Sequence, residues 1–324
     1  MNRYLYVLSG LLLCLNLDAQ VVLTDTLYID QNNRVIPREK SQQAHSYMVR
    51  QLNSNNQLEG QIERFYKDGQ LYESYVYDNG IKHGEFSTFL QDGQPLVKGQ
   101  FKQGRKAGKE QKWFSNGQKQ YEVEYVYDGI TNRQKLIHEW DSTGKARITD
   151  GAGFITLHYP QQGYFEEGSY ENGFKQGEWL GTYNDGNRYY IESYEKGVLL
   201  GGTSLDKQGN TYDYTNITNP ASFKGGQGAW KRYLEQKLKY PRKQRGARAQ
   251  ARVPLQFVVE ANGRLSNIRI PKPTHPDFDK EAMRLLKESP GWSPATLRGQ
   301  KISSQLQTSR EFKLRFNERG RIIN

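Results

Sequence analysis

The middle of the chain consists of short runs in which apolar and polar residues alternate, separated by turns that contain glycine. Asp-Gly or Asn-Gly pairs follow these runs at Asp68-Gly69, Asp92-Gly93 and Asn116-Gly117. Such pairs accept the positive φ that tight hairpin turns require. Asn79-Gly80 and Asn172-Gly173 are suited to the opposite ends of the hairpins. The pattern predicts a succession of antiparallel β-hairpins.

Glycines and aromatic residues in this region recur together at an interval of 24 residues. The glycine columns include Gly60, Gly84 and Gly108, then Gly69, Gly93 and Gly117, and later Gly153, Gly177 and Gly201. The aromatic columns are Phe65, Phe89 and Trp113, then Tyr77, Phe101 and Tyr125, and later Tyr170 and Tyr194. One hairpin cannot bury its aromatic face alone, so neighbouring hairpins must stack as an array. We predict such an array over residues 58–213, after a lead-in segment at 20–57.

The pattern changes after residue 219, where helical and strand periods alternate. Apolar residues at helical spacing predict one helix over 228–238. This helix ends before Tyr240-Pro241, because a residue that precedes proline avoids helical geometry. Residues 251–259 alternate as a strand, and Asn262-Gly263 turns the chain back into a second strand at 265–270. This segment is therefore predicted to be a helix followed by a β-hairpin.

A second helix and a final strand complete the expected C-terminal domain at 220–316. Asp277 is placed to cap a helix from Phe278 to Lys287. Residues 302–316 alternate throughout, which predicts a strand with one buried face. The fold class is thus a mainly β N-terminal hairpin-repeat ribbon plus a small α+β C-terminal domain, ordered helix, β-hairpin, helix, strand. A tail at 317–324 follows.

Composition agrees with thin β-structure and excludes one class of protein. Only 35% of the chain is hydrophobic, whereas 12% is aromatic, with 22 Tyr and 32 Gly. Few aliphatic residues with many tyrosines and glycines suit β-structure better than a thick helical core. No stretch reaches the ~18 continuous apolar residues of a membrane span, which excludes a polytopic transporter.

The first residues predict export from the cytoplasm. Arg3, the apolar run Leu5 to Leu13 and the small residue Ala19 predict a signal peptide at 1–19. Cys14, the one cysteine, would leave with it, so the mature chain would hold no disulfide, thiolate metal site or cysteine nucleophile. This interpretation places the protein in the periplasm, within the cell envelope. The alternative is an uncleaved segment that anchors the chain in the inner membrane.

Charge is divided unevenly along the sequence. Residues 1–219 carry 23 Lys and Arg against 27 Asp and Glu, whereas residues 220–324 carry 23 against 8. The net charges of −4 and +15 predict a boundary near Asn219-Pro220. An exported chain meets no nucleic acid routinely, so anionic lipid or an envelope polymer is the expected counterpart of the basic domain.

The residues that carry most enzyme chemistry are scattered or missing. The five histidines have no metal-ligand spacing, and no phosphate loop or nucleophile elbow occurs in the sequence. Glu166 and Glu167 lie beside predicted turns, and we expect both to be solvated. We therefore expect no catalytic residues, no metal and no cofactor, and a binding protein rather than an enzyme.

Two resemblances cover most of the chain. The 24-residue pattern, most clearly Gly177-Glu178-Trp179 and Tyr183-Asn184-Asp185-Gly186, resembles the MORN-like repeats of bacterial envelope proteins. Residues 220–316 resemble the C-terminal domain of the TonB family. The matching words are Leu238-Lys239-Tyr240-Pro241, Val253 to Val259, Ala261-Asn262-Gly263-Arg264, Phe278-Asp279-Lys280-Glu281-Ala282, Pro290-Gly291-Trp292-Ser293-Pro294-Ala295 and the final strand. The first resemblance implies a spacer or docking module, and the second implies protein binding in transmembrane transport.

The TonB resemblance also implies a mechanism and a set of partner-binding residues. In that family a segment of an outer-membrane transporter pairs with the free edge of the last strand, which supplies main-chain hydrogen bonds. The corresponding residues here are Ser303, Gln305, Gln307, Ser309, Glu311 and Lys313, together with Tyr240 and Pro241. The leading hypothesis is a periplasmic adaptor that binds an outer-membrane TonB-dependent transporter or another envelope protein. The alternatives are a membrane-anchored TonB energy transducer and an envelope glycan-binding repeat protein.

Overall fold

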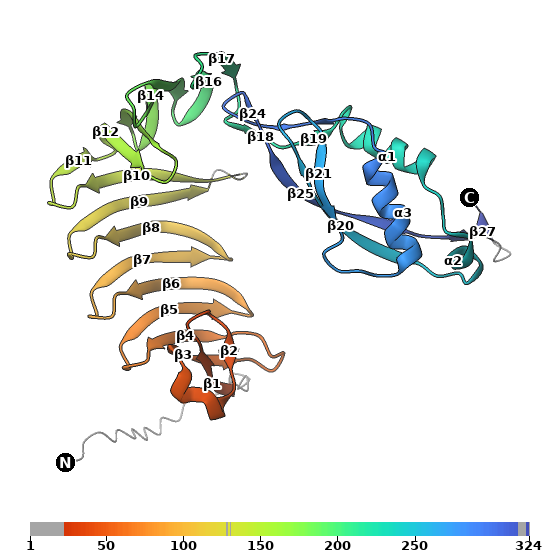
Figure 1. The fold of residues 1–324 in the computed structure, drawn as a ribbon. Helices are drawn as coiled ribbons and strands as arrows, with labels where there is room; N and C mark the ends of the chain where they lie inside the picture. Colours follow the sequence, from red (N-terminus) through yellow and green to blue (C-terminus); the bar gives the residue numbers. More distant parts are fainter. Residues whose placement is uncertain (1–22, 128, 130, 317–321, 324) are drawn as a thin grey trace. The chain divides into compact units, whose positions relative to one another are not determined.

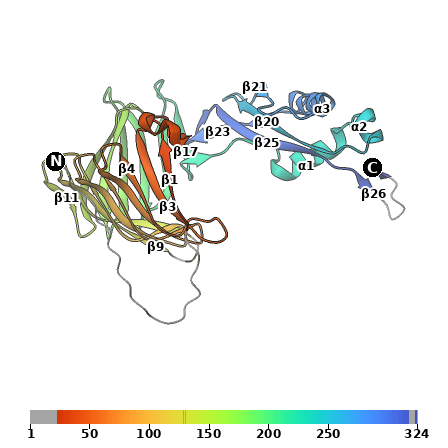
Figure 2. The same cartoon turned by 90° about the horizontal axis from the view of Figure 1, so that it is seen from below.

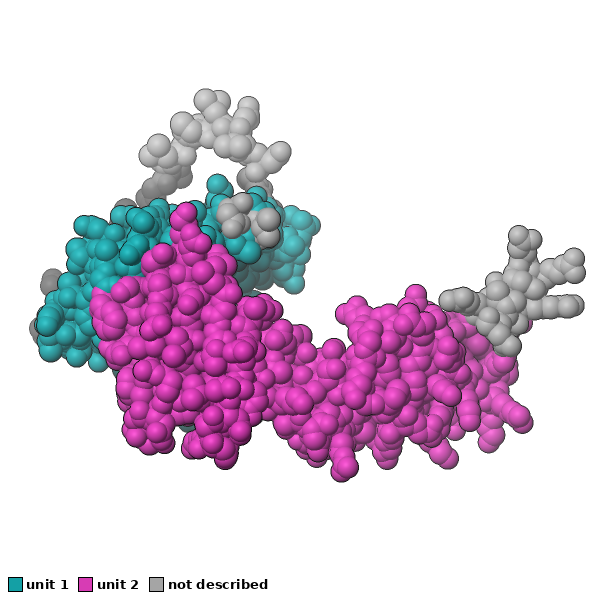
Figure 3. All heavy atoms as spheres, turned by 90° about the horizontal axis from the view of Figure 1, so that it is seen from above, with its two compact units in different colours: residues 1–153, 170–174 teal, residues 154–169, 175–324 magenta. Residues whose placement is uncertain are grey.

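The computed structural model describes residues 23–127, 129, 131–316 and 322–323. Contacts divide the chain into two compact units, residues 1–153 with 170–174 and residues 154–169 with 175–324, which are coloured separately in Figure 3. Most elements are β-strands, and the α-helices all follow the repeats. The predicted fold class, a hairpin ribbon plus a small α+β domain, is confirmed. The predicted signal peptide at 1–19 lies outside the described residues.

The first unit contains an antiparallel series of strands. Its elements are β1 (Leu23–Ile29), β2 (Val35–Ile36), the 3₁₀ helix η1 (Arg38–Gln43), β3 (Ser46–Leu52), β4 (Gly60–Tyr66), β5 (Leu71–Asp78), β6 (Ile81–Phe89), β7 (Pro95–Lys102), β8 (Arg105–Trp113), β9 (Lys119–Tyr127), β10 (Asn132–Trp140) and β11 (Ala146–Thr149). From β3 to β11 each strand pairs with the next one (Figure 1). β1 pairs with β2 and β3, so the lead-in segment is itself part of the sheet.

The hairpin turns lie where the sequence predicts them. Gly69, Gly93 and Gly117 have φ values of 89°, 84° and 83°. The register shifts immediately before each of these turns, at Phe65, Phe89 and Trp113. One predicted aromatic column therefore marks a β-bulge that recurs in each repeat, where an extra residue bends the strand.

A column that the sequence analysis missed forms the buried interior of the first unit. Ile62, Phe86 and Glu110 are 24 residues apart, and each is less than 10% exposed. Glu110 accepts hydrogen bonds from the hydroxyls of Tyr121 and Tyr125, at 3.1 and 3.4 Å. It also forms an ion pair with Lys106. The period was visible in the sequence, but a carboxylate inside the array was not expected.

The second unit contains the last repeats. β12 (Ala152–Tyr159), β13 (Tyr164–Glu171) and β14 (Phe174–Tyr183) have residues in both units, and β15 (Arg188–Glu195), β16 (Val198–Leu205) and β17 (Thr211–Tyr214) follow. Trp179 and Tyr190 are fully buried here. A Cβ on Gly168 would come within 2.4 Å of the Trp179 ring, and one on Gly181 within 2.1 Å of the Tyr190 ring. These two rings thus pack on strand positions that have no side chain.

The C-terminal domain completes the second unit. Its elements are β18 (Thr218–Asn219), β19 (Ser222–Phe223), α1 (Gly226–Lys237), α2 (Arg242–Gly246), β20 (Ala251–Val259), β21 (Leu265–Arg269), α3 (Pro276–Lys287), β22 (Trp292–Ser293), β23 (Ala295–Leu297), β24 (Gln300–Ile302), β25 (Ser304–Phe312), β26 (Arg315–Phe316) and β27 (Ile322–Ile323). The predicted last strand at 302–316 is thus interrupted, and its continuous part is β25. β20 and β25 run side by side over most of the domain (Figures 1 and 2).

One predicted helix cap is wrong. α3 begins at Pro276, and His275 is its N-cap, with a ring nitrogen that accepts a hydrogen bond from the Asp277 backbone at 3.2 Å. Asp277 is therefore inside the first turn, because proline is favourable at the first helical position and moves the start forward. The inward residues Phe278, Ala282, Leu285 and Leu286 are all buried, as the helical spacing predicts. Phe278, Ala282 and Leu286 form one apolar cluster with the inward side chains of β20.

Candidate partner-binding site

β25 lies at one edge of the main sheet of the C-terminal domain. This sheet has three strands in the order β21-β20-β25. β25 pairs with β20 from Ala251↔Phe312 to Val259↔Ser304 without a register shift. In the described part of the chain, no strand pairs with its other side. The free side of β25 therefore offers a regular row of backbone donors and acceptors.

The position of Pro254 indicates which residues of β25 direct their backbone groups to the free side. Pro254 lies opposite Ser309. Proline has no N–H, so this pair cannot exchange the two hydrogen bonds of a hydrogen-bonded antiparallel pair. The N–H and C=O of Ser309 then point away from β20, and the alternation extends this to Gln305, Gln307 and Glu311. The predicted residues inside β25 are thus the ones that present backbone groups to a partner.

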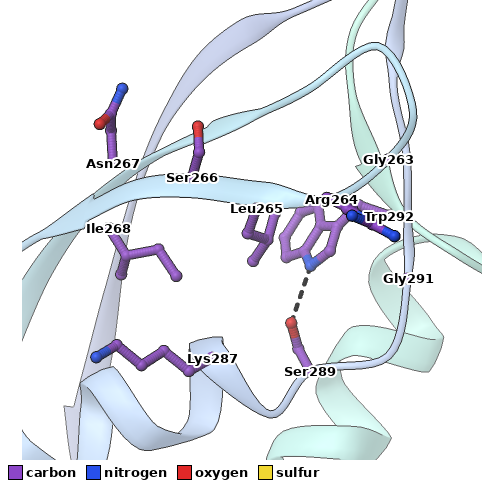
Figure 4. A pocket seen from close by; sticks show the side chains of 10 residues that line it. All are labelled: Gly263, Arg264, Leu265, Ser266, Asn267, Ile268, Lys287, Ser289, Gly291 and Trp292. Atoms are coloured by element: carbon purple, nitrogen blue, oxygen red, sulfur yellow. Dashed lines mark hydrogen bonds between the residues drawn. The ribbon is translucent and has the colours of Figure 1, made fainter.

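The other edge of the sheet, β21, is irregular. Its pairing with β20 shifts register between Gln256 and Val258, and Asn267 has a φ of 48°. A bulge of this kind interrupts the row of backbone groups and blunts an edge. A groove of about 600 Å³ follows this edge, lined by Leu265, Ile268 and Trp292 among others (Figure 4). β25 is therefore the better strand-pairing edge of the two.

The predicted binding residues differ in how their side chains are used. Gln305 and Gln307 are exposed. Ser309 Oγ accepts a hydrogen bond from Arg252 Nε at 2.8 Å, and Glu311 forms an ion pair with Lys313 at 2.8 Å. The hydrogen bond from Lys313 holds the pKa of Glu311 below its usual range. Ser303 precedes β25, and its hydroxyl donates to Glu260 Oε2 at 2.6 Å, which fixes the β20–β21 turn.

Tyr240 and Pro241 lie near the end of β25 but not on its edge. The Tyr240 ring packs edge-on against Phe278 and Phe312, with centroids 5.7 and 6.0 Å away. Its hydroxyl donates to the carbonyl of Ala249. Pro241 is the N-cap residue of α2. The structure thus brings Tyr240 to the core behind β25, and its contact with a partner stays a prediction.

A buried ion pair that was not predicted from the sequence joins the C-terminal domain to the last repeats. Arg298, in the turn between β23 and β24, reaches Glu192 on β15 with a distance of 2.9 Å from Nε to Oε1. The two side chains are 9% and 0% exposed. The Arg298 guanidinium also lies 3.8 Å from the centre of the Tyr190 ring. The last repeats and the C-terminal domain share one compact unit, whereas the change in charge predicts a boundary near Asn219-Pro220.

Hydroxyl groups complete the environment of Glu192. Tyr214 and Tyr194 donate to its two carboxylate oxygens at 2.8 and 2.9 Å. Burial disfavours the charge on Arg298, but Glu192 and the neighbouring tyrosines keep its pKa above the usual range. Burial, followed by the charge and hydrogen bonds of neighbouring glutamates, raises the pKa of Tyr190, Tyr194 and Tyr214. Arg298, Glu192 and these three tyrosines form the junction between the last repeats and the C-terminal domain. In this junction neutral tyrosines surround the ion pair.

Glu166 corrects another expectation. This carboxylate is 4% exposed rather than solvated, and it accepts hydrogen bonds from Tyr159 at 3.0 Å and from Tyr190. Lys175 lies 3.0 Å from it. Burial favours the neutral acid, but Lys175 and the hydroxyls lower the pKa of Glu166 overall. All three of these partners lie within the repeats. Glu166 is therefore part of the repeat interior.

Within residues 23–127, 129, 131–316 and 322–323, no cluster of three or more His, Cys, Asp and Glu side chains is arranged to hold a metal ion. In the same part of the chain, no helix combines the length and the apolar character needed to cross a bilayer.

Comparisons with known proteins bear on the C-terminal domain alone. No curated protein matches the chain, and no family model matches the repeats, so their MORN-like character stays a prediction. One family model matches residues 236–314, which run from the end of α1 to just beyond β25. It describes the Gram-negative bacterial TonB protein C-terminal, and this segment of the chain is therefore similar to the C-terminal domain of TonB.

Proposed function

We propose that the protein is a TonB-like adaptor of the cell envelope that captures a segment of a partner protein by strand addition to β25. The observation that carries this proposal is the regular free edge of β25 within the segment that matches the TonB C-terminal model. TonB C-terminal domains interact with outer-membrane TonB-dependent transporters, so we propose a transporter of this kind as the partner. Such a partner requires a periplasmic location. The repeats then serve as a spacer or a second docking face.

Main-chain hydrogen bonds would supply most of the affinity. An added strand bonds to the backbone N–H and C=O groups that point to the free side of β25. The position of Pro254 indicates that these groups belong to Gln305, Gln307, Ser309 and Glu311. The exposed amides of Gln305 and Gln307 can then contact side chains of the partner. A paired segment also resists force along the strand direction, because several hydrogen bonds must break together. This suits a protein that supports transport.

Site-specific crosslinking in intact cells tests the proposal. A photoreactive amino acid replaces Gln305, and the captured protein is identified by mass spectrometry. The expected product is an outer-membrane transporter crosslinked through its periplasm-facing segment. Capture of no protein, or capture only of copies of this chain, would contradict the proposal.

A pair of variants at Gln307 then tests whether backbone groups mediate the contact. Gln307→Pro removes one N–H on the free side while the hydrogen bonds to β20 remain, a location where edge strands tolerate proline. Gln307→Ala shortens the side chain and keeps the N–H. We expect capture to be lost in Gln307→Pro and retained in Gln307→Ala, with both proteins folded by circular dichroism. Equal capture by the two variants would argue against strand addition.

A further inference from the structure

The helix-facing side of β25 carries a cation without a close partner. Arg310 is half-buried, and its Nε atom is fully buried without a hydrogen-bond partner among the described residues. It shares this side of the strand with Thr308 and Phe312, and it lines a small cavity together with Trp230 and Leu234 of α1. A buried polar atom that lacks a partner costs stability, so Arg310 is an unusual residue at this position.

No carboxylate of the described residues forms an ion pair with the positive charge of Arg310. The carboxylates that act on its charge, Glu311 and Glu235, do so without an ion pair or a hydrogen bond to it. Glu311 is already paired with Lys313. Burial opposes the charge and lowers the pKa of Arg310 despite these two acids. The surrounding domain adds no acidic surplus, because residues 220–324 hold 23 Lys and Arg against 8 Asp and Glu.

The geometry of strand addition brings one partner residue to this cation. Ser309 directs its backbone groups to the free side, so those of its neighbour Arg310 bond to β20. In an antiparallel pairing, the partner residue opposite Arg310 therefore occupies a non-hydrogen-bonded position. In such a pair the Cα atoms are only ~4.5 Å apart and the side chains lie close together on the same face. That partner residue faces the helices, next to the Arg310 side chain.

We infer that the added strand carries an aspartate or glutamate opposite Arg310, and that Arg310 selects this residue and so sets the register of the partner. The inference rests on the proposed function, since it requires strand addition to β25. The carboxylate accepts hydrogen bonds from the guanidinium and gives its Nε atom a partner that the described residues do not supply. Gln305 and Gln307 are on the opposite face and cannot make this contact.

Binding of defined peptides to the full chain tests the inference. The probes are surface-tethered nine-residue peptides of alternating Val and Thr, with Asp or Asn at the central position. A third set carries N-methyl groups on alternate amides, which removes donors without changing charge. The proteins are the wild type, Arg310→Gln, Arg310→Lys and the control Lys272→Gln. Lys272 is exposed in the loop before α3, so its loss changes the net charge equally at a distance from β25.

The wild type is expected to bind the Asp peptide about fivefold more tightly than the Asn peptide, as for a favourable cross-strand charge pair. The ratio falls to about one in Arg310→Gln, and stays above one in Arg310→Lys and Lys272→Gln. An unchanged ratio in Arg310→Gln overturns the inference. If the Asp and Asn peptides bind the wild type equally and N-methylation abolishes binding, strand addition stands and the role of Arg310 is wrong. If no peptide binds, or N-methylation has no effect, both proposals are contradicted.

Discussion

The last repeats and the C-terminal domain, which share one compact unit, have interiors of different chemistry. The repeat interior combines Trp179, Tyr190 and Tyr214 with the buried carboxylates Glu166 and Glu192. The interior of the C-terminal domain is a contiguous apolar cluster that includes Val253, Phe257, Phe278, Leu286 and Phe312. Two helices cover the sheet of this domain, whereas the described repeats are built from strands alone.

The difference follows from the thickness of each region. A single layer of strands has little volume for aliphatic side chains, so rings lie flat on glycines and their hydroxyls need acceptors. Glutamates supply the acceptors, and each buried glutamate then needs a cation nearby. Lys175 serves Glu166 from within the repeats, but Glu192 receives its cation from the C-terminal domain. The stability of the repeat interior thus depends on each buried glutamate having its hydrogen-bond donors and its cation. The stability of the C-terminal interior depends on close packing of apolar side chains.

The largest expected effect comes from removing Arg298. Arg298→Met keeps much of the side-chain volume but leaves Glu192 buried without a cation. Breaking a buried pair in this way costs about 3–5 kcal/mol. We expect a loss of this size in the free energy of unfolding of the second unit, measured by chemical denaturation. Faster amide exchange in β15 and β16 should accompany it.

A double variant separates the charge from the packing. In Arg298→Met with Glu192→Gln the unpaired charge is gone, and we expect most of the lost stability to return. If the single variant costs no more than the ~1.5 kcal/mol of a volume-conserving core change, the junction behaves like an apolar core and the comparison fails.

The C-terminal core should respond to volume instead. Leu286 is fully buried in the apolar cluster, so Leu286→Ala leaves a cavity and should cost about 2–5 kcal/mol. Leu286→Met conserves volume and should cost less than ~1.5 kcal/mol. Thermal unfolding of both variants measures the difference. Similar losses in the two would show that shape rather than volume limits this core.

Local sequence patterns predicted most strands and helices, but they did not predict polar contacts between residues far apart in the chain. The 24-residue period and the Asp-Gly and Asn-Gly turns placed the hairpins, since turn geometry is set by adjacent residues. The start of α3 was misplaced because Asp277 and His275 can both accept a capping hydrogen bond. Glu166 was expected to be solvated because it lies beside predicted turns, and the side chains that surround it come from other strands.

The candidate site was predictable to a similar degree. The alternation after residue 302 predicted a strand with one buried face, and the TonB resemblance implied that one edge of this strand is free. The sequence did not indicate the Arg298–Glu192 pair, because the two residues are 106 positions apart and no local period relates them. Arg310 was also missed, since a charged residue among Leu306, Thr308 and Phe312 has no distinctive pattern.

The next largest effect is expected from high pH, which should lower the stability of the tyrosine-rich junction. Burial raises the pKa of Tyr190, Tyr194 and Tyr214 in the folded protein, whereas an unfolded tyrosine ionises near pH ~10. Stability is therefore intact below pH ~10 and falls as the pH rises further, because the unfolded chain releases protons that the fold retains. The loss is at most about 1.4 kcal/mol per tyrosine per pH unit. Denaturant unfolding at pH 8, 10 and 11 measures it.

A phenylalanine variant provides the control for this titration. Tyr214→Phe removes one titrating hydroxyl, so the decline with pH should become shallower while stability at pH 8 falls because Glu192 loses a hydrogen bond. An unchanged slope would mean that Tyr214 ionises equally in both states. The difference in tyrosinate absorbance between the wild type and Tyr214→Phe should appear together with unfolding rather than before it.

The smallest effect is expected at the exposed side chains of β25. Gln305→Ala and Gln307→Ala remove groups that contact solvent, so each should change the free energy of unfolding by less than ~0.5 kcal/mol. Thr308→Ala, on the helix-facing side of the same strand, should cost more because it enlarges the cavity beside Arg310. Chemical denaturation of the three variants tests this order. A larger loss at Gln305 or Gln307 than at Thr308 would mean that the outer face of β25 is covered in the folded protein rather than in contact with solvent.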